Sequence, residues 1–266
     1  MRRIEKVFEE DLSRNVAVQR VNAPVAYHVN LADLHYGLND RGLFRENLDF
    51  LLSIPNLYFG IGGDCGNGAS KISKGNPLEE WASGDKQLYA IAEDLKPAVD
   101  ANRLLYIIEG NHLAGRYKDT TFHTPEELLA YILGKPSLFK GEQCFLYFNV
   151  NKNLYVHYIH HYNTKQPDYF QWINADVTWR EHIHQNAVTR KITLDHNKYT
   201  KKPIVKVNLD VQSGHWQILP SYIKIKGIRP TPPGCYIVEM GGLERKLFAW
   251  DNEQFYHMVS KGYKVD

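Results

Sequence analysis

The chain has 266 residues, a formal net charge of +2 at pH 7, 43% hydrophobic residues and 23% charged residues. This length suits one large α/β domain or two small ones, and it is sufficient to bury a substantial core. The near-neutral charge lacks the basic excess of a typical nucleic-acid binder, although it leaves room for a local basic patch.

The cysteines and the N-terminal sequence restrict the class of protein further. Cys65, Cys144 and Cys235 are far apart and form no CxxC pair, which argues against a cysteine-based zinc site and a disulfide framework. The first twelve residues, MRRIEKVFEEDL, lack the apolar core of a signal peptide. No apolar run approaches the ~18 residues of a membrane span. We therefore expect a cytoplasmic protein that does not act in a membrane.

The first half of the chain alternates strand and helix patterns. Thr124 is the expected N-cap of the second helix, with Pro125 at its first helical position. Such alternation predicts parallel βαβ units. In chain order we expect a polar lead-in over residues 1–20, strands at 25–37 (ending in a polar loop) and 56–64, a helix at 86–101, a strand at 103–111 and a helix at 124–133.

The second half consists mostly of strand patterns, which predicts meanders. No Pro/Gly/Ser linker separates the halves, so we expect one domain over residues 1–266, with 195–266 as its β-rich completion. The RPTPPG stretch at 229–234 is expected to be a loop before an edge strand. The expected elements are two strands within 143–161, a short helix and a strand within 167–180, and strands at 186–195, 203–209, 235–241 and 246–251.

Asp, Asn and His side chains collect where the predicted strands end. A single such residue is usually a turn or surface residue, but five successive strand ends that carry them are hard to explain as turns. Ligands of open α/β sheets bind at the carboxyl ends of the strands. The residues are Asp33 and His35, then Asp64, then Asn111 and His112, then His160 and His161, and finally His182 and His184.

These residue types suit a pair of divalent metal ions. Two ions about 3.5–4 Å apart can clamp the attacking and leaving oxygens of a phosphoryl transfer. Mixed nitrogen and oxygen ligands suit Mn, Fe, Zn or Ni. In Asp33-Leu34-His35 and His182-Ile183-His184, the two polar residues are two positions apart. On an extended segment this spacing places both side chains on the same side, so they can reach one ion or two adjacent ions.

At these motifs the chain resembles the calcineurin-like metallophosphoesterase superfamily. The family pattern DxH, GD, GNH, a His usually followed by Gly, and GHxH corresponds, in the same order, to five motifs between residues 33 and 184. They are Asp33-Leu34-His35, Gly63-Asp64, Gly110-Asn111-His112, His160-His161 and His182-Ile183-His184. The EGNHLAGR stretch and the His pair resemble the phage and prophage branch. The resemblance implies an α/β fold, a four-layer α/β/β/α sandwich.

The resemblance also implies a role for each residue around two divalent ions. Asp33, His35 and His184 would bind the first ion, Asp64 would bridge, and Asn111, His161 and His182 would bind the second. His160 stays an alternative to His161. His112 would not bind metal but would protonate the leaving oxygen as a general acid. A metal-bridging hydroxide would be the nucleophile.

Several positions depart from the family pattern. Glu181 replaces the Gly of GHxH, Tyr162 replaces the Gly after the His pair, and Leu113 replaces a frequent acidic residue. Glu181 could add a carboxylate near the site or strain the site. Gly214-His215 is a second candidate for the last motif, but it lacks the second His.

Together these features predict a metal-dependent phosphoesterase. The expected substrate is a phosphodiester, such as a nucleic acid or a nucleotide, with a phosphomonoester as the nearest rival. Arg116 is a candidate phosphate-binding residue. Two other classes remain: a catalytically impaired fold that acts as a binding or interaction module, and a nucleic-acid-binding protein with minor hydrolytic activity. The metal identity and the oligomeric state do not follow from the sequence.

Overall fold

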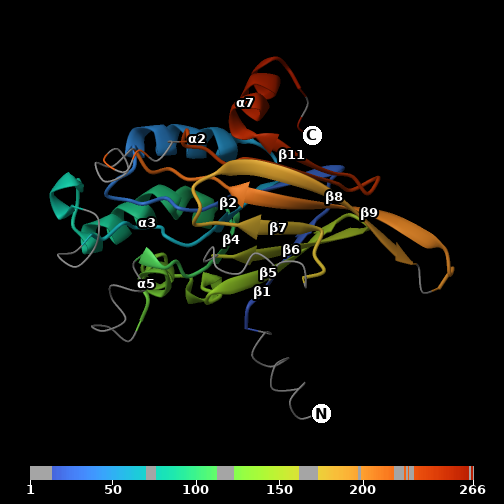
Figure 1. The fold of residues 1–266 in the computed structure, drawn as a ribbon, viewed down its shortest axis with the longest axis horizontal. Helices are drawn as coiled ribbons and strands as arrows, with labels where there is room; N and C mark the ends of the chain where they lie inside the picture. The colour runs from blue at the N-terminus through green and yellow to red at the C-terminus, as the bar shows by residue number, and fades with distance from the viewer. Residues whose placement is uncertain are drawn as a thin grey trace, which may run out of the picture.

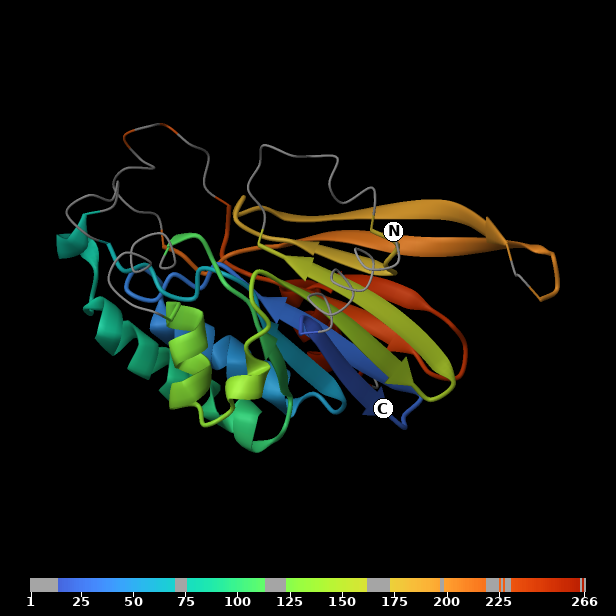
Figure 2. The same cartoon turned by 90° about the horizontal axis from the view of Figure 1, so that it is seen from below.

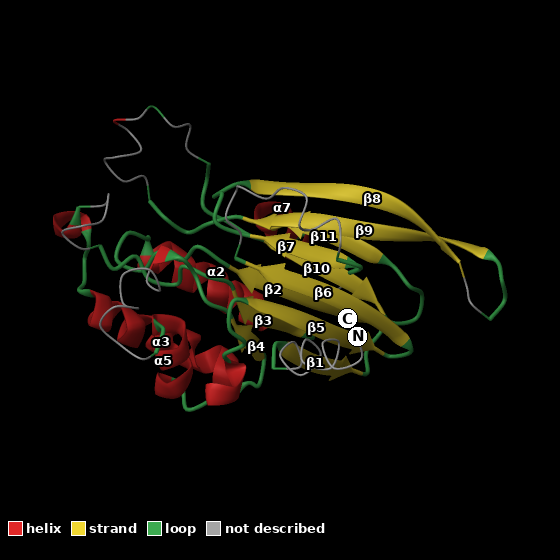
Figure 3. Ribbon diagram, turned by 60° about the horizontal axis from the view of Figure 1, so that its bottom comes forward, coloured by secondary structure: helices red, strands yellow, loops and turns green. Residues whose placement is uncertain are grey.

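Two β-sheets lie face to face, with helices gathered on the outer side of one of them (Figures 1 and 3). The computed structural model describes residues 14–69, 76–112, 123–161, 173–196, 199–218, 225, 227, 231–263 and 265. Within this part of the chain, no helix is long and apolar enough to cross a membrane.

The five-stranded sheet has the order β11-β10-β2-β3-β4. Its strands are β2 (Val25–Leu31), β3 (Leu57–Ile61), β4 (Leu104–Ile107), β10 (Tyr236–Gly241) and β11 (Leu247–Asp251). β2, β3 and β4 are parallel, which confirms the βαβ prediction. The edge-strand prediction for 235–241 is wrong, because β10 lies between β2 and β11 and is antiparallel to both.

The six-stranded sheet has the order β1-β5-β6-β7-β9-β8. Its strands are β1 (Val16–Val21), β5 (Gln143–Val150), β6 (Asn153–His160), β7 (Val177–Arg180), β8 (Asn186–His196) and β9 (Pro203–Ser213). The meander prediction holds for the β5–β6 and β8–β9 pairs, but the β1–β5, β6–β7 and β7–β9 pairs are parallel. The expected lead-in is also shorter, because its last residues form β1. The β8–β9 hairpin extends beyond the other strands (Figure 2).

The helices begin at residues that suit helix starts. They are α2 (Arg41–Ser53), α3 (Gly84–Asp100), α5 (Pro125–Ile132) and α7 (Asn252–Ser260), with short 3-10 turns η1 (Pro77–Glu79) and η2 (Pro136–Leu138). The predicted helices correspond to α3 and α5, and Thr124 Oγ1 accepts a hydrogen bond from Glu127 N–H as an N-cap. The helices α2 and α7 were not predicted from the sequence, although Asp40 and Asp251 cap them in the same way.

Two apolar clusters hold the layers together. One packs α2, α3, α5 and α7 against the five-stranded sheet, and the other fills the space between the two sheets. The mixed α/β fold with two sheets is confirmed. Among the described residues, no helix covers the outer face of the six-stranded sheet, so the fourth layer of the expected sandwich stays a prediction. Most of the helix expected within 167–180 lies outside the described residues.

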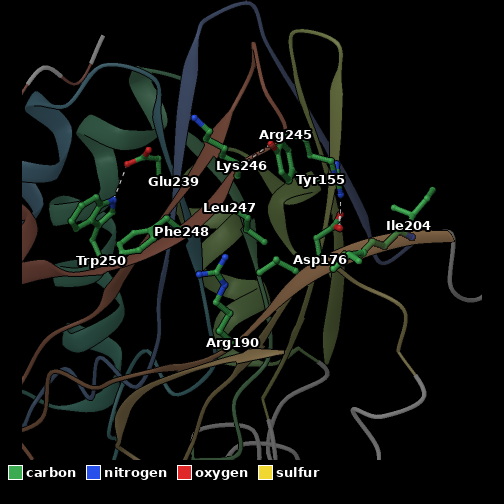
Figure 4. A pocket seen from close by; sticks show the side chains of 13 residues that line it. Tyr155, Asp176, Arg190, Ile204, Glu239, Arg245, Lys246, Leu247, Phe248 and Trp250 are labelled. Atoms are coloured by element: carbon green, nitrogen blue, oxygen red, sulfur yellow. Dashed lines mark hydrogen bonds and ion pairs between the residues drawn. The ribbon is translucent and has the colours of Figure 1, made fainter. Parts of the chain in front are cut away.

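A cavity of about 660 Å³ opens between β9 and β11, at the side of the two sheets (Figure 4). Apolar and aromatic side chains line it, including Leu247, Phe248 and Trp250. Three charged groups in its lining are already engaged: Arg245 pairs with Asp176, and Glu239 accepts a hydrogen bond from Trp250 Nε1 at 2.8 Å. None of the predicted site residues lines this cavity.

Candidate metal centre

The loops that follow β2, β3 and β7 are joined by hydrogen bonds that their backbone N–H groups donate. Asp33 N–H donates to Gly63 O at 3.0 Å, and His35 N–H donates to Asp64 O at 3.0 Å. His182 N–H donates to the Asp33 carboxylate at 2.8 Å. Strand ends that are far apart in the sequence therefore meet at one place, as expected for the carboxyl ends of parallel strands.

The structure brings six of the predicted ligands together in two groups of three. The atoms that could ligate a metal ion lie, within each group, within 4.8 Å of one another. In the first group, His35 Nε2 lies 3.0 Å from His184 Nε2, and His184 Nε2 lies 3.4 Å from Asp33 Oδ1. In the second group, Asp64 Oδ2 lies 3.3 Å from His161 Nε2 and 3.9 Å from His182 Nδ1. The division agrees with the two ligand sets that the resemblance implied.

Asn111 lies beside the second group. Its amide oxygen Oδ1 is 3.4 Å from His161 Nε2. The Gly of the same motif cannot be replaced without a steric clash, because a Cβ on Gly110 would lie 1.9 Å from the Asp64 backbone nitrogen. Glycine at this position therefore lets the loop after β4 approach the loop after β3.

The backbone at these positions is unusual. Five of the six grouped residues adopt a left-handed conformation, with φ of 49° at Asp33, 46° at His35, 55° at Asp64, 73° at His182 and 50° at His184. Such a conformation costs energy in residues other than glycine and is seldom found outside turns. Backbone strain of this kind gathers at binding and catalytic sites, so its concentration here supports the cluster as a candidate site.

The structure brings His161, and not His160, into the cluster. The His161 side chain is 4% exposed and reaches Asp64, whereas the His160 ring stacks on Tyr158 with 6.2 Å between ring centroids. Alternate residues of a strand face opposite sides, so two successive histidines cannot both enter the same site. The assignment of His161 as a ligand stays a prediction, but its position is the one that the role requires.

The buried groups of the cluster shift one another's pKa values, in a direction that differs from group to group. Burial raises the pKa of Asp64, but the neighbouring His161 outweighs burial and brings that pKa well below its ordinary value. Burial likewise lowers the pKa of His161, yet Asp64 and Glu181 outweigh it and raise that pKa well above its usual range. Burial, with help from His112 and His184, lowers the pKa of His35, which favours the neutral imidazole that binds metals.

His112 lies beside the cluster and is partly exposed to solvent. Its backbone N–H donates to Asp64 Oδ1 at 2.6 Å, and its Nε2 lies 3.9 Å from Asp64 Oδ2. Its ring packs edge-on against His35 with 4.8 Å between centroids, and its side chain is 26% exposed. The side chain is therefore beside both groups and open to an incoming molecule.

Two further residues lie near the cluster: His215, which the sequence offered only as a second candidate for the last motif, and Thr231, which no motif marked. His215, part of the rejected second motif, stacks on His184 with centroids 4.9 Å apart and contacts Thr231 Oγ1 through Nε2 at 2.8 Å. Thr231 in turn donates to the carbonyl of His184. The Gly214-His215 sequence was the feature that drew attention to His215. In the structure His215 is a neighbour of the site and belongs to neither group of candidate ligands. Arg116, Leu113 and Tyr162 lie outside the described residues.

A buried carboxyl group, that of Glu126, contacts the residue that follows Asp64. Cys65 Sγ donates to Glu126 Oε1 at 3.5 Å, and both residues are fully buried. Burial, assisted by the charge of Asp64, raises the pKa of Glu126 to about 7. Burial also raises the pKa of Cys65, so this thiol is a packing group rather than a reactive one.

We expect Glu126 to make the metal-free protein less stable at alkaline pH. Its folded pKa exceeds the unfolded value, so its contribution is present at low pH and is lost as pH rises through about 7. Relative to Glu126→Gln, the wild type should lose about 2 kcal/mol of unfolding free energy from about pH 5 to about pH 8. Urea unfolding of both proteins at the two pH values measures this. Parallel pH dependence of the two proteins would contradict it.

The donor set fits a pair of divalent ions. Asp33 Oδ1 and Asp64 Oδ2 are buried, and neither accepts a hydrogen bond from the described part of the chain. Such atoms are costly unless something positive binds them. Each faces imidazole nitrogens of its own group, and carboxylate oxygens with imidazole nitrogens are ligands for Mn, Fe, Zn or Ni.

Comparisons with known proteins add a likeness of fold. No protein-family model matches the chain, and no curated protein matches it. It is similar to the structure of an archaeal phosphodiesterase (12% identity, 85% of this chain and 99% of that chain, TM-score 0.38). It is also similar to a serine/threonine phosphatase from Saccharomyces cerevisiae (9% identity, 94% of this chain and 89% of that chain, TM-score 0.41). A third similar structure is NAD nucleotidase from Haemophilus influenzae (9% identity, 86% of this chain and 49% of that chain, TM-score 0.38). Likenesses this distant carry no argument about function, which must come from the site.

Proposed function

We propose that this protein is a dinuclear metal-dependent phosphoesterase that hydrolyses phosphodiesters of nucleic acids or nucleotides. The observation that carries the proposal is the pair of three-residue ligand groups, built largely on left-handed backbone at strand ends. Buried carboxylate oxygens without hydrogen-bond donors from the described residues supply the negative charge that two cations would offset.

The residues divide into metal-binding and substrate-facing roles. Asp33, His35 and His184 would hold one ion, and Asn111, His161 and His182 the other, with Asp64 shared between them. When bound, two divalent ions lower the pKa of water and offset charge on the phosphoryl group. His112, at the open edge of the cluster, would give its proton to the leaving oxygen.

The first test is hydrolysis of bis-p-nitrophenyl phosphate and p-nitrophenyl phosphate by metal-free protein, with Mn²⁺, Ni²⁺, Zn²⁺ or Mg²⁺ added in turn. We expect metal-dependent cleavage, with the diester preferred. A preference for the monoester would redirect the search to phosphatase substrates. No turnover with any metal, together with no bound metal, would overturn the proposal and favour an interaction module.

A further inference from the structure

Glu181 stands where the resembled family has glycine, and its carboxylate does not join either group of ligating side chains. The residue follows β7 directly, and only 1% of it is exposed. Its backbone is not among the left-handed positions, so nothing in its conformation requires glycine. Its carboxylate instead lies behind His161, at the ring nitrogen that faces away from Asp64.

Three donors hold this carboxylate in place. Oε2 accepts hydrogen bonds from Gly63 N–H at 2.8 Å and from His161 Nδ1–H at 3.1 Å, and Oε1 accepts one from Asn30 Nδ2 at 2.6 Å. Because a carboxylate only accepts, Nδ1 of His161 must carry the proton. Once the ring is neutral, as a metal ligand must be, its lone pair lies on Nε2, which faces Asp64 and Asn111.

Two neighbouring glycines provide the space for this arrangement. A Cβ on Gly62 would lie 2.4 Å from Glu181 Oε1, and a Cβ on Gly63 would lie 2.3 Å from His161 Nδ1. Any side chain at either position would therefore push Glu181 or His161 out of place. The absence of a side chain at Gly62 and Gly63 thus leaves the space that the Glu181 carboxylate and the His161 ring occupy. The chain therefore has room for glutamate where the family has glycine.

Asn30 fixes Glu181 from the interior of the sandwich. Its Nδ2 also donates to Ser213 Oγ at 3.0 Å, and its Oδ1 accepts from Tyr106 OH at 2.9 Å. Asn30 and Tyr106 are fully buried, and the three residues Asn30, Tyr106 and Ser213 come from β2, β4 and β9. With both ends of the amide engaged, Asn30 can present only its nitrogen to Glu181.

We propose that Glu181 is a positioning residue that selects the metal-facing tautomer of His161 and holds its ring at the second group. A ligating imidazole typically donates its other N–H to a carboxylate or carbonyl, which orients the ring and makes it a better ligand. Loss of such a partner typically lowers metal affinity by ~10–100-fold. The inference rests on the proposed function, because it assumes that His161 binds metal.

The test is calorimetric titration of metal-free protein with Mn²⁺, without substrate. Wild type should bind two ions. Glu181→Gln keeps the size of the side chain but offers one acceptor oxygen to three donors. We expect it to weaken one metal position by ~10–100-fold and to leave the other unchanged. In a His161→Ala background the same change should cause no further loss, since Glu181 acts through His161.

Glu126→Gln is the matched control, because it makes the same change in a buried glutamate that touches neither group. It should bind both ions as the wild type does. If Glu181→Gln fails to fold, Glu181→Asp keeps the charge, shortens the reach and should weaken the same position. This inference alone would be overturned if the wild type and the Glu181 variants bound Mn²⁺ with equal affinity. It would also be overturned if the Glu181 change lowered the Mn²⁺ affinity equally in the wild-type and His161→Ala backgrounds. Absence of metal binding by the wild type would overturn the proposed function with it.

Discussion

Replacement of Asp64 with alanine should empty both metal positions and remove hydrolysis. Asp64 carries the buried oxygen that faces His161 and His182, and its other oxygen anchors the backbone of His112. Loss of the charge stabilisation that two ions provide is worth several kcal/mol, so turnover should fall by roughly 10³-fold or more. Metal analysis of the purified variant, alongside the diesterase assay, measures both effects.

Asp176→Asn is a suitable control for the Asp64 variant. Asp176 is also a buried carboxylate, but it pairs with Arg245 at the cavity between β9 and β11, away from the proposed metal ligands. This variant should keep two ions. Retention of two ions by Asp64→Ala would show that Asp64 is not shared between the positions.

Replacement of His112 with alanine should leave the metal content intact and lower turnover by roughly 10²–10⁴, the usual contribution of a general acid. The ring lies beside Asp64 and His35 but belongs to neither group of ligating side chains. The loss should be larger for a dinucleotide than for bis-p-nitrophenyl phosphate, because p-nitrophenolate leaves without needing a proton.

The comparison of the two substrates separates proton donation from other roles of His112. A purely electrostatic role would lower both rates to a similar extent. His160→Ala serves as the control, since that histidine packs on Tyr158 outside the cluster. Loss of metal in His112→Ala would mean that the imidazole is a ligand and that the assigned division of roles is wrong.

The alternation of apolar strands and helices in the first half is a local property, and it identified β2, β3, β4, α3 and α5. Other elements depend on partners that are distant in the sequence. The short polar-flanked strand β1 forms because Val16–Val21 pair with Phe145–Val150, more than a hundred residues away. Similarly, α2 and α7 are stabilised by packing on the five-stranded sheet, where Phe44 and Phe255 are buried.

The choice between His160 and His161 shows the same limit within the site. The sequence places both at the end of one strand, and alternation sends them to opposite faces. Only the packing of β6 shows which face is inward: Tyr155, His157 and Ile159 are buried between the sheets, so His161 continues the inward series. The direction of Glu181 and its contact with Asn30 likewise require the two sheets to be placed against each other.

The sequence by itself therefore determined which side chains the candidate site can offer: which strand ends carry Asp, Asn and His, and in what order. Those residue types and spacings are local, and the loops that carry them fold next to their own strands. The tertiary structure decided which side chains meet, because strand order, register and the facing of two sheets are set by contacts between distant segments. For that reason the sequence indicated a metal centre and drew attention to Glu181 and His215, while only the fold revealed Asn30 and the contacts that these residues make around it.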